Sequence, residues 1–329
     1  MSDLGDILGG LSGDIVGDFS PQGNGGVQIP YAKSLTKEAF NFLTTIAGRE
    51  DPRSPGFHAS GMYSVCDREF LLTVLTETST QSYIEAELRL KFLLGHQIHS
   101  LLQDDILGPA GLIKGFWKCR KCGWYYNEPS SNILLSCPKG TCQSCGNQWW
   151  GYVEPKVRIA VPGVPDEPMW NIVGACDGIR TSGGVLDIKT ISPRGVGYLE
   201  DSWGEVDAET DWGFPNEKLS WSKKSVRKYF VQLQLYMHGF NEKSGIVLYV
   251  PKDTIDDMKT WIEIPVEYNK DVVDIIFDKI RRIYSCYQKI TDKSIDSVPD
   301  LPKRVCHTAT CYRARDCAVA DECFRMKNG

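Results

Sequence analysis

The spacing of apolar residues changes along the chain from a helical period to a strand period and back, and these changes predict the order of the elements. Helical spacing covers about 36–50, a stretch after Cys66, 79–106, 223–240 and 270–290. Strand-like segments cover 152–161, 170–181, 185–191, 245–252 and 260–268. This order of helices and strands predicts an α/β sandwich built on a mixed sheet.

Glycine and polar residues mark the connections between these elements. Ser182-Gly183-Gly184 joins two of the strand-like segments and is typical of a hairpin. The polar stretch 200–222 is predicted to be a loop. Residues 1–30 contain eight glycines, four aspartates and no lysine or arginine, which predicts a flexible tail. The helical spacing of five apolar residues there also fits a short docking helix: Leu4, Ile7, Leu8, Leu11 and Ile15.

The composition narrows the class of protein. The chain has 329 residues, of which 42 % are hydrophobic, so it can bury a sizeable core and is not disordered as a whole. No apolar run approaches the ~20 residues of a membrane-spanning helix, and the N-terminus has no secretion signal, so we expect a cytoplasmic protein. The net charge of −5 excludes a uniformly basic surface but allows a local basic groove.

Twelve cysteines are the most unusual feature of the composition. In a chain without an export signal, metal binding explains them better than disulfides, because a reducing cytoplasm keeps thiols reduced. Cys176 and Cys286 lie in apolar sequence and are interpreted as packing residues. The others are the isolated Cys66, a middle cluster and a C-terminal cluster.

The middle cluster contains two C-x-x-C-G motifs. Two residues between thiolates let one tight turn present both sulfurs, and the following glycine relieves the turn. The pattern predicts a structural Zn²⁺ site, held by Cys119, Cys122, Cys142 and Cys145, in an inserted module. Cys137 is a fifth cysteine that could replace one of the four.

The C-terminal cluster contains Cys306, Cys311, Cys317 and Cys323, separated by four, five and five residues. This spacing does not repeat the zinc motif. The four thiolates could bind zinc among themselves, or part of them could bind an iron–sulfur cluster together with Cys66. The second interpretation leaves one cysteine too many.

Several polar residues stand where they could perform chemistry. Asp187 and Lys189 lie two apart on a strand and share a face, and Asp177 lies on the preceding hairpin strand. Two converging carboxylates suit Mg²⁺ or Mn²⁺, and a lysine beside them can act on water or phosphate. On the long helix His99 could complete such a site, with His96 as the competing histidine.

The order of these motifs resembles the RecB-like branch of the PD-(D/E)XK nuclease superfamily. That branch shows a helical G-x-x-x-H, a strand Asp, D-x-K on the next strand and Q-x-x-x-Y on a helix. The matching residues are Gly95 with His99, Asp177, Asp187 with Lys189, and Gln232 with Tyr236. The resemblance covers about residues 60–325 and leaves the zinc insert and the tail unexplained.

This resemblance implies a restriction-endonuclease-like core and metal-dependent hydrolysis of DNA, with exonuclease action expected. It implies that His99, Asp177 and Asp187, with the Ile188 carbonyl, hold Mg²⁺ or Mn²⁺, and that Lys189 orients or activates the water. By the same resemblance, Gln232 and Tyr236 contact the substrate backbone or the lysine. Glu154 is a further candidate carboxylate, because some family members have one on this strand.

The resemblance also bears on Cys66. Iron–sulfur members of the branch take one cysteine before the nuclease core and three after it, the last two separated by five residues. Cys66, Cys317 and Cys323 match, and the remaining ligand of a [4Fe-4S] cluster is Cys306 or Cys311, of which we prefer Cys306. The usual C-x-x-C before the final cysteine is absent. A nuclease with both a zinc insert and a cysteine-rich end is similar to proteins of tailed bacteriophages, which implies the host cytoplasm as its location.

Segment 218–228 carries five basic residues and no acidic one. We expect this segment to bind DNA phosphates. We also expect the protein to have a phage recombination, replication or packaging protein as a further partner, and not to bind a membrane. The predicted DNA-binding residues are Lys223, Lys224, Arg227 and Lys228.

The predicted organisation has five parts. They are a tail (1–30), an N-terminal helical part of the nuclease domain (31–114), the zinc-ribbon insertion (115–150), the nuclease core (151–300) and a cysteine-rich iron–sulfur cap (301–329). Two rival functions remain open: a DNA-binding protein whose nuclease site is degenerate, and a virion or transcription protein organised by its zinc ribbon.

Overall fold

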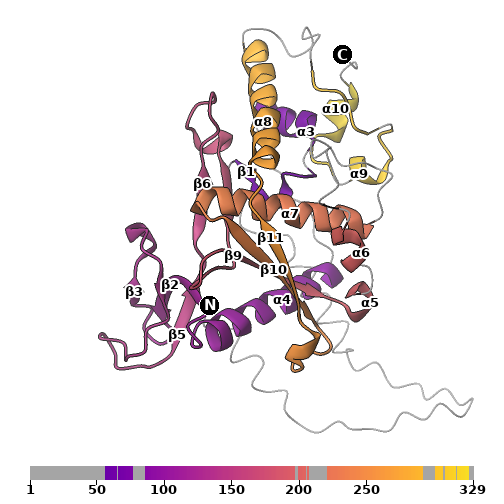
Figure 1. The fold of residues 1–329 in the computed structure, drawn as a ribbon. Helices are drawn as coiled ribbons and strands as arrows, with labels where there is room; N and C mark the ends of the chain where they lie inside the picture. The colour runs from indigo at the N-terminus through magenta and orange to yellow at the C-terminus, as the bar shows by residue number, and fades with distance from the viewer. Residues whose placement is uncertain are drawn as a thin grey trace, which may run out of the picture. The chain divides into compact units, whose positions relative to one another are not determined.

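Figure 1 shows the fold of the computed structural model. The described residues are 56–64, 66–76, 86–196, 199–204, 206, 221–291, 301–306, 308–315 and 317–325. The predicted tail of residues 1–30 and the helix expected over 36–50 lie outside them. In the described part, no helix combines the length and the apolar character that crossing a membrane requires.

The helices follow the predicted order. They are α3 (Asp67–Thr76), α4 (Ala86–Ser100), α5 (Pro193–Val196), α6 (Leu199–Gly204), α7 (Trp221–Phe240), α8 (Lys270–Thr291), α9 (Tyr312–Arg315) and α10 (Ala320–Arg325). Helix α4 continues into a π-helical segment, η2 (Leu101–Leu107). Short 3-10 turns are η1 (Ala59–Gly61), η3 (Pro129–Ser131), η4 (Pro168–Trp170) and η5 (Met258–Thr260). Helix α6 overlaps the first residues of the predicted loop 200–222 and α7 overlaps its last two, so that prediction is wrong at both ends.

The strands form two sheets. They are β1 (Phe57–His58), β2 (Ile113–Cys119), β3 (Tyr125–Asn127), β4 (Leu135–Ser136), β5 (Trp150–Val153), β6 (Lys156–Ile159), β7 (Ile172–Ala175), β8 (Gly178–Arg180), β9 (Val185–Ile191), β10 (Ser244–Pro251) and β11 (Ile262–Glu267). One sheet has the order β1-β7-β6 and the other β11-β10-β9-β8-β2-β3, with β4 and β5 also paired to β2. Strands β9 and β10 are parallel, whereas β8–β9 and β10–β11 are antiparallel, which confirms the mixed sheet.

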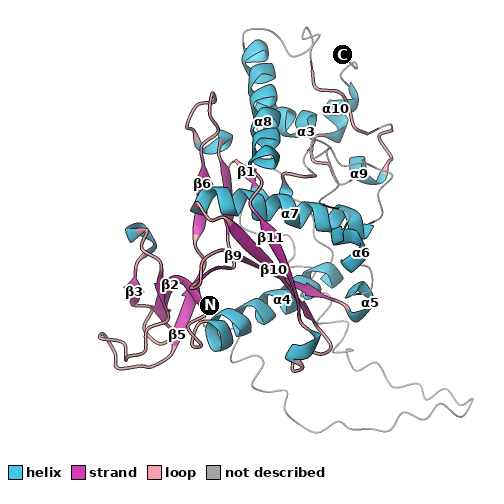
Figure 2. Ribbon diagram, viewed as in Figure 1, coloured by secondary structure: helices cyan, strands magenta, loops and turns pink. Residues whose placement is uncertain are grey.

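Helices α4 and α7 cover opposite faces of β9 and β10 (Figure 2). Val247 and Tyr249 pack in the core cluster that includes α7. The alternate residues Leu248 and Val250 pack with Ile98 of α4. This alternation follows from the two-residue period of a strand.

Two of the predicted strands are interrupted, so their prediction as single strands is wrong. Glu154 and Pro155 separate β5 from β6, and Cys176 and Asp177 separate β7 from β8. Proline has no N–H to donate to the ladder, and the Pro155 carbonyl instead accepts a hydrogen bond from the Cys176 N–H at 2.9 Å. The two breaks therefore lie side by side, and each carries a carboxylate.

The hairpin between β8 and β9 is confirmed. Gly183 and Gly184 have φ values of 93° and 94°, which glycine adopts without strain. A Cβ at Gly184 would also lie 2.9 Å from the Ser244 carbonyl oxygen, so this turn needs glycine for space as well. The turn fixes the register that places Asp177 beside β9.

Candidate functional site

Three polar side chains meet where the two strand breaks face α4. His99 Nδ1 lies 3.2 Å from Asp177 Oδ1, although 78 residues separate them in the sequence. One ligand atom each from His99, Glu154 and Asp177 all lie within 4.8 Å of one another. Carboxylate oxygens and an imidazole nitrogen form a donor set that suits a divalent cation.

Gln103 donates hydrogen bonds to two members of this group. It was not identified as a site residue from the sequence. Its Nε2 donates to Glu154 Oε1 at 3.1 Å and to the Asp177 carbonyl oxygen at 2.9 Å. The side chain is buried, with 5 % of its surface exposed. Its position four residues after His99, on the same face of the helical stretch, is the signal that could have identified it.

The neighbouring strand β9 supplies a second pair of charges. Lys189 Nζ lies 2.8 Å from Asp187 Oδ1 and 2.7 Å from Oδ2. The Ile188 N–H donates to Asp177 Oδ2, which joins β9 to the first group. Asp187 is not part of the compact ligand set, but its negative charge raises the pKa of both His99 and Lys189.

The electrostatics show crowding of negative charge. Burial raises the pKa of Asp187 to about 6, although the Lys189 charge opposes this. Burial and the Asp177 charge raise the pKa of Glu154. Burial by itself would raise the pKa of Asp177, but the hydrogen bond and charge of His99, the Lys189 charge and the Ile188 N–H together lower it. Burial opposes a charge on His99 too, yet Asp177 raises the pKa of the imidazole. A divalent cation would relieve the repulsion between these carboxylates, so the donor set fits one.

Helix α7 covers the Lys189 side of the site. The Tyr229 ring lies 4.9 Å from Lys189 Nζ, and Gln232 Nε2 donates to the Tyr236 hydroxyl at 3.0 Å. Both residues of the predicted pair are buried. Tyr229 was missed, although it precedes Gln232 by three residues and therefore shares its face of the helix.

The predicted DNA-binding residues occupy the first turns of α7 and differ in exposure. Lys223, Lys224 and Lys228 are partly exposed, whereas Arg227 is buried, with 5 % of its surface exposed. The three lysines are therefore the solvent-accessible members of this set.

The middle cysteines form a second compact group. The sulfurs of Cys119, Cys122, Cys142 and Cys145 lie within 4.8 Å of one another. Cys119 Sγ is 3.5 Å from Cys145 Sγ, and Cys122 Sγ is 3.7 Å from Cys142 Sγ. Cys137 is not in this group. The cysteine cluster could therefore hold a metal ion.

Two equivalent turns build the group. The Gly123 N–H donates to the Cys119 carbonyl at 2.9 Å, and the Gly146 N–H donates to the Cys142 carbonyl at 2.8 Å. Both glycines have positive φ, 74° and 71°, as the C-x-x-C-G spacing requires. Burial disfavours the Cys119 thiolate, but nearby backbone N–H groups and the Asn147 amide lower the pKa of this thiol to about 6. A thiolate is the form that binds metal.

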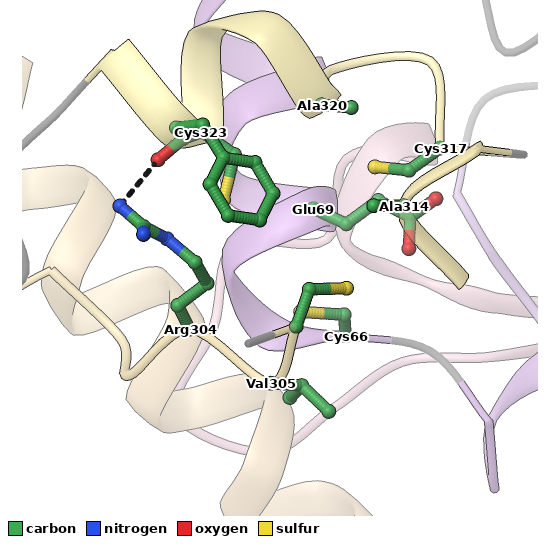
Figure 3. Close-up of a pocket in the computed structure, with 10 residues that line it drawn as sticks. Cys66, Glu69, Arg304, Val305, Ala314, Cys317, Ala320 and Cys323 are labelled. Atoms are coloured by element: carbon green, nitrogen blue, oxygen red, sulfur yellow. Dashed lines mark hydrogen bonds between the residues drawn. The ribbon is translucent and has the colours of Figure 1, made fainter. Parts of the chain in front are cut away.

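A pocket beside α3 and α10 collects cysteines from both ends of the described chain (Figure 3). Its lining includes Cys66, Cys306, Cys317 and Cys323. Cys311 is not among the lining residues, and its sulfur accepts a hydrogen bond from the Ala314 N–H at 3.4 Å. The carbonyl of Cys323 accepts hydrogen bonds from Arg68, which joins α10 to α3, and from Arg304, which joins α10 to the segment 301–306.

No family model matches the chain. No curated protein matches it either. Similar solved structures include SSO0001, with a TM-score of 0.38, 13 % identity, and coverage of 87 % of this chain and 94 % of that chain.

Two further solved structures are exonucleases. The alkaline exonuclease LHK-Exo of Laribacter hongkongensis, in complex with dAMP, has a TM-score of 0.37 and 13 % identity, and covers 78 % of this chain and 94 % of that chain. A phage-related exonuclease from Haemophilus somnus 129PT has a TM-score of 0.26 and 12 % identity, and covers 41 % and 62 %. The pairing of the chain's own strands gives the mixed α/β fold, and the solved structures to which it is similar include exonucleases.

Proposed function

We propose that this protein is a DNA nuclease of the PD-(D/E)XK type that requires Mg²⁺ or Mn²⁺ and acts as an exonuclease in DNA processing, recombination or replication. The observation that carries the proposal is the convergence of His99, Glu154 and Asp177 beside the Asp187–Lys189 pair. The cation ligands would be His99, Asp177, Asp187 and the Ile188 carbonyl, with Glu154 added because its carboxylate lies in the compact set.

Each residue then has a role in hydrolysis of a phosphodiester. A bound cation would supply a water of lowered pKa and offset charge on the phosphate. Lys189, hydrogen-bonded to Asp187, would orient the attacking water or donate to a phosphate oxygen. The Tyr229 ring lies against the ammonium group and would help to hold it in place. Gln232 and Tyr236, which are hydrogen-bonded to each other on α7, would contact the substrate backbone or Lys189.

The cysteine groups would be structural in this proposal. Cys119, Cys122, Cys142 and Cys145 would bind one Zn²⁺, because four protein thiolates fill a tetrahedral site. Cys66, Cys306, Cys317 and Cys323 would hold a [4Fe-4S] cluster that joins α3 to the C-terminal segment. DNA would lie along the first turns of α7, near Lys223, Lys224 and Lys228.

Asp187→Asn tests the activity. We expect the purified protein to degrade linear DNA in the presence of Mg²⁺ or Mn²⁺. The cleavage rate of the variant should be at least ~100-fold lower, because a group that stabilises the transition state is removed. Asp271→Asn, an acid in the first turn of α8, is the control and should cleave normally. Cleavage that survives in Asp187→Asn, or in excess chelator, would contradict the proposal. DNA binding by the unaltered protein without cleavage would favour the degenerate DNA-binding protein.

A further inference from the structure

Arg120 connects the four-cysteine module to the segment that carries Gln103. It lies inside the first C-x-x-C turn, but its guanidinium extends out of the module. Nη2 lies 3.0 Å from Asp104 Oδ2 and 2.9 Å from Asp105 Oδ1. Both aspartates belong to η2, directly after Gln103.

Asp104 transmits this contact to β5. While one of its oxygens pairs with Arg120, the other accepts the Tyr152 N–H at 2.5 Å. Strand β5 ends at Val153, and the next residue is Glu154. Segment η2 therefore binds β5 and its end at two successive points, through Asp104 to Tyr152 and through Gln103 to Glu154.

The packing of η2 leaves it little room to shift. Its last turn ends at Gly108, whose N–H donates to the Gln103 carbonyl at 3.1 Å. A Cβ at Gly108 would lie 2.3 Å from Trp117 Cη2 and 2.5 Å from the Gln103 carbonyl oxygen. Trp117 is fully buried and lies on β2, two residues before Cys119. Movement of the module would therefore reach Gln103 through packing as well as through charge.

We propose that Arg120 is a positioning residue that couples the four-cysteine module to the carboxylate site. It holds Asp104 and Asp105, these fix η2, and η2 sets the position of Gln103 and through it Glu154 and Asp177. This inference rests on the proposed function of His99, Glu154 and Asp177 as a divalent-cation site. An ion pair at the surface adds little to the free energy of unfolding by itself. The role of Arg120 is therefore to position η2 rather than to stabilise the fold.

Arg120→Gln tests the coupling through cation affinity. We expect it to raise the Kd for Mn²⁺, measured by calorimetry, about tenfold, the lower end of the effect of removing an outer partner of a metal ligand. Zinc content and the midpoint of thermal unfolding should stay unchanged. Lys121→Gln is the matched control, because it removes the same charge from the next residue of the same turn. Arg120→Lys should restore part of the affinity.

Asp104→Asn provides a second variant outside the cysteine turn. It keeps an oxygen for the Tyr152 N–H but removes the charge that Arg120 binds. It should raise the Kd for Mn²⁺ as Arg120→Gln does. The double variant Arg120→Gln/Asp104→Asn should bind Mn²⁺ no more weakly than either single variant. If Arg120→Gln disturbs the module, Asp104→Asn alone decides the question.

The outcomes separate the two proposals. If both variants bind Mn²⁺ as tightly as the unaltered protein, the coupling is wrong, while Asp187→Asn still tests the nuclease. If an equal loss appears in Lys121→Gln, the effect is one of general charge and the coupling is again wrong. If the unaltered protein does not bind Mn²⁺, the proposed function fails and the coupling fails with it.

Discussion

Gly95 of α4 lies so close to Thr190 of β9 that a Cβ at position 95 would be 3.3 Å from Thr190 Oγ1. This distance is tighter than ordinary contact between side chains. Because His99 stands one turn further along the same helix, the approach of α4 to β9 sets how far the imidazole reaches toward Asp177. The G-x-x-x-H spacing therefore has a packing reason.

Gly95→Val should lower DNA cleavage at least ~10-fold, because a branched side chain must push α4 away from β9, and a small misplacement of a catalytic group is costly. Gly95→Ala should lower the cleavage rate much less, because Thr190 need move only slightly. Alanine also favours the helix by about 1 kcal/mol relative to glycine. Cleavage rates of both variants and of Gly95→Val/Thr190→Ala measure this. Equal rates for all three would contradict the packing explanation.

Cys142→Ser should abolish stoichiometric zinc binding, because each of the four sulfurs is within 4.8 Å of the other three. Cys137→Ser should retain the metal, since its sulfur lies outside the group. Zinc content of the purified proteins is the measurement. Loss of zinc in Cys137→Ser would restore the alternative in which Cys137 is a ligand.

Cys306→Ser should lose iron and the visible absorption of a cluster in an anaerobic preparation, because Cys306 lines the same pocket as Cys66, Cys317 and Cys323. Cys311→Ser is the matched variant, five residues along the chain, and should keep both. The opposite result would make Cys311 the ligand. A colourless unaltered protein with two zinc ions would remove the iron–sulfur cluster and leave the nuclease proposal standing.

His238 should make stability depend on pH. Burial lowers its pKa below the ordinary 6.5; Lys270 and Lys243 lower it further, and Asp274 opposes them. Its Nδ1 is 2.8 Å from the Tyr268 hydroxyl. The unfolded chain therefore takes up a proton first, so this contribution to stability is complete above pH ~6.5 and is lost as pH falls through the folded pKa.

Chemical unfolding at pH 7 and pH 5 checks this. His238→Phe keeps a ring against Phe277 but cannot titrate. The unaltered protein should lose more of its free energy of unfolding between the two pH values than His238→Phe does. An equal loss in both proteins would show that His238 does not contribute.

The sequence alone determined which local geometries were available. C-x-x-C-G spacing requires a tight turn with a positive-φ glycine, and both Gly123 and Gly146 have one. D-x-K on a strand puts Asp187 and Lys189 on one face, and they pair there. These features depend on a few consecutive residues, so neighbouring residue types are enough to predict them.

Only the tertiary structure decided which distant residues meet. The strand breaks at Pro155 and Cys176 lie against each other through one backbone hydrogen bond, and this brings Glu154 to Asp177. Gln103 and Tyr229 showed nothing distinctive by type, and their partners come from other elements. A contact between elements depends on the angle and distance at which they pack, and these follow from the whole core rather than from the spacing of residues within one element.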